Sequence, residues 1–220
     1  MAAPAALLHY IHDPLCGWCY GAWPLVTAAR AVLPVTAHGG GMMAGRNRRR
    51  VSADLRNHVM PHDHRIAQLS GQVFGERYFN GLLTDSSAVF DSGPPIAAVL
   101  AMQALKGNDA GLDLLAAIQR AHYQEGRRIS DEPVLVALAA QLGADGPAFA
   151  SAMQQQDLDA HFQTTRGLLD RVGGRGFPTF ALQRGEAMDV IDVAMWLGRP
   201  VQWVAHLRGA MAGASALPGR

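Results

Sequence analysis

The sequence is poor in cysteine, in charge and in aromatic residues. Of its 220 residues only two are cysteine, 17% are charged and 7% are aromatic. The formal net charge of +1 argues against a nucleic-acid partner and against any partner recognised by strong charge. No apolar run approaches the length of a membrane span, so no membrane partner is expected either.

The N-terminus lacks the pattern of a secretory signal. Residues 2–8 are apolar, but no basic residue stands before them. We therefore expect a cytoplasmic protein, in which a lone cysteine pair is more often catalytic than structural. With 49% hydrophobic residues, the chain can bury a sizeable core in one large domain or two small ones.

Both cysteines lie in one motif, Cys16-Gly17-Trp18-Cys19. The motif follows a strand-like run and begins a predicted helix, where unpaired backbone N–H groups favour a thiolate. The thiolate is the form that attacks disulfides. The spacing lets Cys16 face solvent while Cys19 packs beneath it, within reach of a disulfide. The pattern therefore favours redox catalysis.

A bare Cys-x-x-Cys motif has two other interpretations. A structural zinc site needs four ligands, and the chain has no second cysteine pair. A structural disulfide in so short a loop restrains little entropy of the unfolded chain. Three nearby histidines, His58, His62 and His64, lack a completing ligand pattern, and Pro61 interrupts their helical spacing, so no metal site is expected.

The apolar periodicity predicts an α/β protein. Strands are expected at 7–12, 35–38, 179–183 and 187–192, and helices at 17–32, through most of 45–157, at 157–171 and at 198–208. Pro24 is expected to kink or restart the first helix. The basic run 46–50 is expected to be a solvated turn before a helix capped by Ser52. A loose tail is expected from Gly209 onward.

A second motif, Phe177-Pro178-Thr179, precedes a late strand, where thioredoxin-like proteins place a cis-proline. Together with the cysteine motif it resembles the thioredoxin fold as elaborated in the DsbA family. Over residues 7–208 the resemblance is to the FrnE-like, cytoplasmic branch of that family. The segments that support it are 13–21, 39–41, 90–94, 119–127 and 129–131.

The resemblance implies a thioredoxin-like fold interrupted by an all-helical insertion. The chain would then divide into an N-terminal β-α-β part of the thioredoxin-like domain, the insertion, the C-terminal α-β-β-α part and a flexible tail. These parts correspond to residues 1–44, 45–157, 158–208 and 209–220.

The resemblance also implies roles at the site. Cys16 is expected to be the nucleophile and Cys19 the resolving thiol. The loop of Phe177, Pro178 and Thr179 is expected to offer backbone groups to an extended substrate.

Three residues near the thiols are candidates for further roles. An exposed Trp18 between the thiols has little packing reason, so we expect it to contact substrate. Gly17 and Trp18 are also expected to tune the redox potential. His12 is either a tuning group near the sulfurs or a hydrogen-bonded strand histidine.

No cofactor other than the redox-active disulfide is expected, and the expected partners are protein or peptide thiols and disulfides. Glutathione stays open as a co-substrate. Gly17-Trp18 differs from the Pro-His of strongly oxidising DsbA, so the potential is not transferable. Without the second cysteine pair of some FrnE-type proteins, isomerase activity that relies on such a pair loses its support. The direction of electron flow and the oligomeric state stay open.

Two other functions fit this architecture. Kappa-class glutathione transferases and 2-hydroxychromene-2-carboxylate isomerases resemble it and bind glutathione at the proline loop. They generally use a single serine or cysteine, and the cysteine pair argues against them. A non-catalytic peptide-binding protein whose thiols only sense redox state is the third candidate. The solvent-ready position expected for Cys16 argues against that one.

Overall fold

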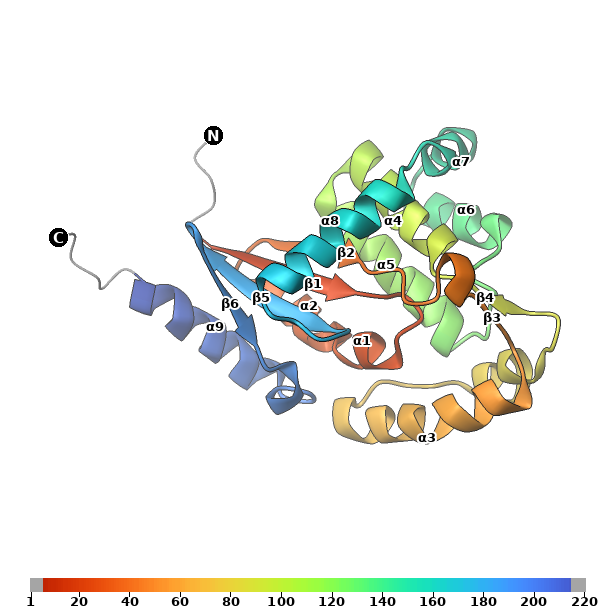
Figure 1. The fold of residues 1–220 in the computed structure, drawn as a ribbon, viewed down its shortest axis with the longest axis horizontal. Helices are drawn as coiled ribbons and strands as arrows, with labels where there is room; N and C mark the ends of the chain where they lie inside the picture. Colours follow the sequence, from red (N-terminus) through yellow and green to blue (C-terminus); the bar gives the residue numbers. More distant parts are fainter. Residues whose placement is uncertain (1–5, 215–220) are drawn as a thin grey trace.

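A four-stranded sheet lies between helices in the computed structural model, which describes residues 6–214 (Figure 1). Its order is β2 (Val35–Gly39), β1 (Leu7–His12), β5 (Thr179–Arg184) and β6 (Ala187–Ile191). Strand β1 is parallel to β2 and antiparallel to β5, which is antiparallel to β6. The four predicted strands are confirmed to within one residue at each end.

The two faces of the sheet bury different helices. Tyr10 and Phe180 belong to the large core on the face covered by α2 (Trp23–Arg30) and α9 (Pro200–Ala214). On that face the Trp203 indole donates a hydrogen bond of 3.0 Å to the carbonyl of Leu25. Ile11 on the opposite face packs in a smaller cluster with α8 (Leu158–Arg171), which crosses the sheet in Figure 1. The neighbouring residues Tyr10 and Ile11 thus point to opposite faces of the sheet, as expected of a strand that is covered on both faces.

The first predicted helix is divided in two. The helix α1 (Gly17–Gly21) ends before Ala22, and α2 begins at Trp23 with Pro24 in its first turn. Proline is tolerated there because its missing N–H would have no partner within the helix. The restart expected at Pro24 is confirmed, and the cysteine motif therefore occupies a single-turn helix at the end of β1.

The segment between β2 and α8 is mainly helical. Its longer helices are α3 (Ala53–Ser70), α4 (Gly93–Lys106), α5 (Asn108–Tyr123), α6 (Glu132–Gln141) and α7 (Gly146–Gln154), with short helical turns η1 (Gly45–Asn47), η2 (Arg77–Gly81) and η3 (Leu82–Thr84). It departs from the predicted all-helical character in one place. Strand β3 (Arg49–Arg50) pairs with β4 (Val89–Phe90), so the basic run is only partly a turn. The predicted cap is confirmed, because Ser52 Oγ accepts from Leu55 N at 3.2 Å.

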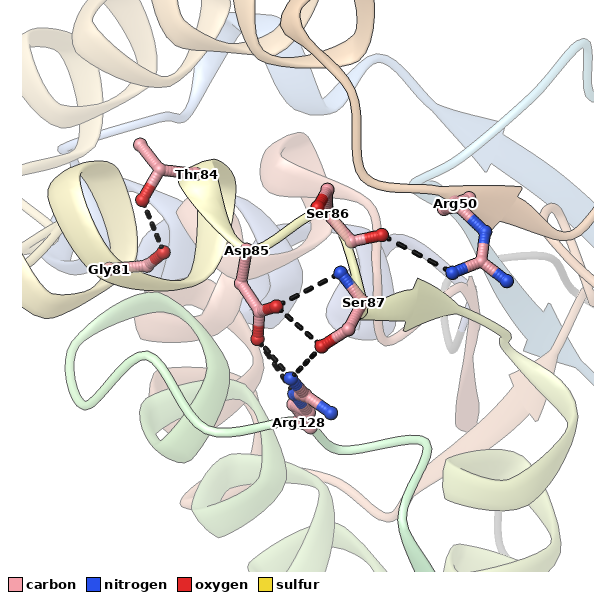
Figure 2. A network of polar contacts seen from close by, with 7 residues as sticks. All are labelled: Arg50, Gly81, Thr84, Asp85, Ser86, Ser87 and Arg128. Carbon is pink, nitrogen blue, oxygen red and sulfur yellow. Dashed lines mark hydrogen bonds and ion pairs between the residues drawn. The ribbon is translucent and has the colours of Figure 1, made fainter.

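A polar network joins the residues before β4 to the loop after α5 (Figure 2). The Arg128 guanidinium donates to the Asp85 carboxylate and to the Ser87 hydroxyl. Ser87 N also donates to Asp85, at 3.0 Å. These partners, Ser87 first and then Arg128, lower the pKa of Asp85 to about 2. Arg50 Nη1 donates to the carbonyl of Ser86 and so ties β3 to the same network.

Two expectations about chain breaks are wrong. Pro61 does not end α3, which continues to Ser70 and buries Ile66 beyond it, so tertiary packing offsets the lost hydrogen bond. Residues 209–214 are the end of α9, where Arg184 Nη1 donates to the carbonyl of Ala210 at 2.9 Å. The rest of the predicted tail, 215–220, lies outside the described residues. Within residues 6–214, no helix is both long and apolar enough to cross a bilayer.

Candidate active site

The two cysteines are free thiols one turn apart. Cys16 is the N-cap residue of α1, and Cys19 lies within the helix. Cys16 is 7% exposed and Cys19 0%. The predicted order of exposure is correct, but the expected solvent-facing Cys16 is wrong. Its thiol lies against the proline loop, where Cys16 Sγ is 3.5 Å from the carbonyl oxygen of Phe177.

Burial keeps Cys19 in its thiol form. Its pKa is raised well above the usual value, first by burial and then by the adjacent Cys16. The backbone N–H of Asp13 donates to Cys19 Sγ at 3.5 Å, and the Tyr10 hydroxyl donates to the Cys19 carbonyl at 2.9 Å. A protonated, covered thiol suits a group that reacts second.

The proline loop lies over the first cysteine. The Phe177–Pro178 peptide bond is cis, and both residues are half-buried. A Cβ atom on Gly40 would come within 2.0 Å of the Phe177 ring, so the end of β2 packs directly against the loop. The Thr179 side chain is buried, and its hydroxyl donates to the Gly176 carbonyl at 2.7 Å instead of facing outward.

Two of the three tuning candidates, Trp18 and His12, are half-buried and buried. Trp18 is half-buried against the core, so the predicted exposed indole is wrong. His12 is 1% exposed and stacks on Tyr10. Burial, followed by His38 and His161, lowers the pKa of His12 to about 3, so the ring is neutral near pH 7. Its Nδ1 finds no hydrogen-bond partner in the described part of the chain.

Asp13 ties the cysteine motif to two other segments. Its carboxylate accepts hydrogen bonds from Leu15 N at 2.9 Å, from Met42 N at 2.6 Å and from Ser92 Oγ at 2.8 Å. Full burial raises its pKa to about 6 despite these donors. The residue therefore fixes the loop after β2 and the start of α4 relative to the thiols.

A second buried carboxylate approaches from α3, which lies beside α1 in Figure 1. Asp63 is 3% exposed, and its Oδ1 lies 2.5 Å from the position of a Cβ atom on Gly17. The Tyr78 hydroxyl donates to Oδ2 at 2.9 Å. Burial raises the pKa of Asp63 to about 7.

The fold matches the solved structures of a disulfide reductase. A structure titled cytosolic disulfide reductase DsbM from Pseudomonas aeruginosa is 54% identical, with 94% of this chain and 98% of that chain covered and a TM-score of 0.86. The same protein with GSH matches with a TM-score of 0.85 over 94% of this chain and 99% of that one. A scan against protein-family models and a search of curated proteins found no match.

The chain belongs to the DsbA family. Within the family it is FrnE-like, and it is a thiol-disulfide oxidoreductase. A putative protein disulfide isomerase from Nitrosomonas europaea, 23% identical with a TM-score of 0.78 over 97% of this chain and 99% of that one, shows the same fold. A 2-hydroxychromene-2-carboxylate isomerase, 15% identical with a TM-score of 0.59 over 96% of this chain and 100% of that one, shows the fold alone and does not outweigh this reading.

Sequence reasoning missed both carboxylates of this DsbA-family site. Asp13 has no role of its own among the predictions, although Asp-Pro before a Cys-x-x-Cys motif is a signal for a turn whose side chain accepts backbone hydrogen bonds. Asp63 stands between His62 and His64, and its burial follows only from how α3 packs on α1. The histidines around it point away: His64 stacks on Phe79 and His62 lies beside His58. Among the described residues no group of metal-ligating side chains forms a site.

Acid is expected to destabilise this DsbA-family protein. Burial lowers the pKa of His12, His38 and His122 to about 3, so the unfolded chain, with histidine pKa values near 6.5, takes up three protons that the folded chain does not. Asp13 and Asp63 oppose this, because their raised pKa values of about 6 and about 7 let the folded chain hold two protons. The histidines outnumber the two carboxyl groups, so the unfolding free energy should fall as the pH decreases from about 6 to about 4, the range in which the carboxyl groups of the unfolded chain stay ionised.

Asp63→Asn should make this fall steeper by about 1.4 kcal/mol per pH unit, because the folded protein then holds one proton fewer. Urea unfolding at several pH values measures both slopes. Equal slopes for the two proteins would contradict the protonation of Asp63 in the folded state.

Proposed function

We propose that the protein is a cytosolic disulfide reductase that takes its electrons from glutathione. The observation that carries the proposal is the order of the thiols: Cys16 lies against the Phe177 carbonyl at the proline loop, and Cys19 is fully buried beneath it. The relative that is 54% identical is named a cytosolic disulfide reductase and has a structure with GSH.

The reaction follows from this order. The Cys16 thiolate attacks one sulfur of a substrate disulfide, a mixed disulfide forms, and the other substrate sulfur leaves as a thiolate. Cys19 then loses its proton and attacks Cys16, which releases the second substrate thiol and leaves a Cys16–Cys19 disulfide. Two glutathione molecules reduce that disulfide in the same two steps and leave as one glutathione disulfide. Two electrons thus pass from glutathione to the substrate.

We assign substrate contact to the surface around the thiols. Trp18, Phe177 and Pro178 are half-buried there, and the loop backbone would pair with an extended substrate chain as an added strand. Thr179 supports the loop through its bond to Gly176 rather than by touching substrate. The insertion, proposed to span 45–157, would border this surface through α3, which packs on α1. Residues 1–44 and 158–208 would complete the thioredoxin-like domain.

The redox potential of the Cys16/Cys19 couple tests the direction of transfer. Equilibration with glutathione buffers should give a value nearer thioredoxin, at about −270 mV, than DsbA, at about −120 mV. Each 30 mV corresponds to about 1.4 kcal/mol for two electrons, so the two outcomes are well separated. A value near that of DsbA would make the protein an oxidase and contradict the proposal.

Glutathione dependence has its own test. Reduction of a disulfide-bonded peptide should proceed with glutathione, glutathione reductase and NADPH, and stop when glutathione is omitted. Glutathione-dependent conversion of a substrate without a disulfide, kept by Cys19→Ala, would instead support a glutathione transferase or isomerase, because such enzymes use one nucleophile.

A further inference from the structure

The helix α3 places a carboxylate against the cysteine motif. Asp63 Oδ1 occupies the space that a side chain on Gly17 would need, 2.5 Å from the ideal Cβ position. Gly17 is the first residue of α1 and the neighbour of Cys16. Only a residue without a Cβ atom allows so close an approach. An acidic group from outside the central sheet therefore lies directly on the Cys-x-x-Cys backbone.

The surroundings of Asp63 offer little to neutralise its charge. The Tyr78 hydroxyl donates to Oδ2 at 2.9 Å. Tyr123 is buried, and burial is the main reason why its pKa is raised. Charges on Asp63, Cys16 and Cys19 raise this pKa further, so the Tyr123 ring lies within electrostatic reach of both the carboxylate and the sulfurs. Among residues 6–214, no lysine, arginine or histidine forms an ion pair with Asp63. A charge in such a setting is weakly screened and acts strongly on its neighbours.

We propose that Asp63 is a positioning residue whose negative charge, held against Gly17, opposes the Cys16 thiolate and makes the Cys16/Cys19 couple a stronger reductant. The oxidised motif is an uncharged disulfide, whereas the reduced motif carries a negative charge when Cys16 ionises. A fixed negative charge nearby raises the free energy of the ionised reduced motif and leaves the disulfide unaffected. The proposal rests on the disulfide exchange proposed above, whichever way the electrons flow.

The charge on Asp63 depends on pH near neutrality, because burial raises its pKa to about 7. The ionisable side chains that interact with it are Tyr78 from η2, whose hydroxyl donates to it, and Tyr123 from α5, whereas the cysteine motif meets it through Gly17. Burial raises the pKa of both tyrosines far enough that they stay neutral in this range. The effect of Asp63 on the couple is therefore present above about pH 7 and is lost as the carboxyl group takes up a proton below it.

Asp63→Asn tests the proposal in the full chain. At about pH 8 the equilibrium constant for reduction of the Cys16–Cys19 disulfide by glutathione should rise about tenfold. This rise corresponds to a reduction potential that is about 30 mV less negative. Iodoacetamide should alkylate Cys16 faster at the same pH. Both differences should shrink at about pH 5.5, where the wild-type carboxyl group is protonated. Asp54→Asn is the matched control, since Asp54 is an exposed carboxylate in the first turn of the same helix and should leave both readouts unchanged.

An equilibrium constant for Asp63→Asn equal to that of the wild type, or an equal shift in Asp54→Asn, would overturn the proposal. Should Asp63→Asn fail to fold, Tyr78→Phe keeps the carboxylate and removes its hydrogen bond. This variant should shift the constant in the same direction, by less, at about pH 7, and no shift would overturn the proposal. An oxidising wild-type potential would contradict the reductase function, whereas the comparison between variant and wild type would still decide the role of Asp63.

Discussion

Cys16→Ser is expected to reduce disulfide exchange to the uncatalysed rate, because the serine hydroxyl is not ionised near neutral pH and cannot replace the attacking thiolate. The fold should survive, since serine keeps the size of the side chain and its hydroxyl can donate to the Phe177 carbonyl that Cys16 Sγ faces at 3.5 Å. Turnover of a disulfide-bonded peptide with glutathione measures the loss. Circular dichroism and the urea midpoint check that the variant is folded.

Cys19→Ser is expected to fail at a different step. Its Cys16 can still attack, so a mixed disulfide with the substrate should accumulate and be visible on a non-reducing gel. In Cys16→Ser no such adduct should form, which makes the two variants controls for each other. Equal residual turnover by both, without an adduct in either, would contradict the assignment of Cys16 as nucleophile and Cys19 as the resolving thiol.

The sequence predicted the sheet and the place of the thiols because these depend on local patterns. Strand β1 is an apolar run, Pro24 marks the restart of the helix, and both cysteines stand in one motif. The Phe177–Pro178 segment is predicted from the resemblance to thioredoxin-like proteins, which place a cis-proline before a late strand. That these residues carry out the chemistry stays a prediction, which the cysteine variants above are designed to test.

The two carboxylates were out of reach of the sequence because their burial is set by tertiary packing. Asp13 becomes a buried acceptor only when Met42 and Ser92 fold against it. Asp63 reaches Gly17 only because α3 continues through Pro61, where a local rule predicts a break. Trp18 is also placed by tertiary packing. Its position between two reactive cysteines predicts exposure, yet its side chain is half-buried against core residues.

The largest loss of stability is expected from Gly126→Ala, at the end of α5. Gly126 has a φ of +65°, and a Cβ atom there would come within 2.2 Å of the Arg77 carbonyl oxygen. After the helix, Arg127 N donates to the Ala121 carbonyl and Gly126 N to the His122 carbonyl, with Gly126 in the left-handed region that favours glycine. Backbone strain and overpacking add, so the substitution should cost about 2–5 kcal/mol.

Gly167→Ala is the matched control for this substitution. Gly167 is exposed within α8, and nothing lies within 4 Å of the Cβ position, so alanine should stabilise the helix by about 0.5–1 kcal/mol. The midpoint of thermal unfolding should then be lower than that of the wild type by about 4–20 °C for Gly126→Ala and slightly higher for Gly167→Ala. A normal midpoint for Gly126→Ala would contradict the close contact between the end of α5 and η2. That contact holds the rings of Tyr123 and Tyr78 around Asp63, so its loss should also remove the redox shift proposed for that carboxylate.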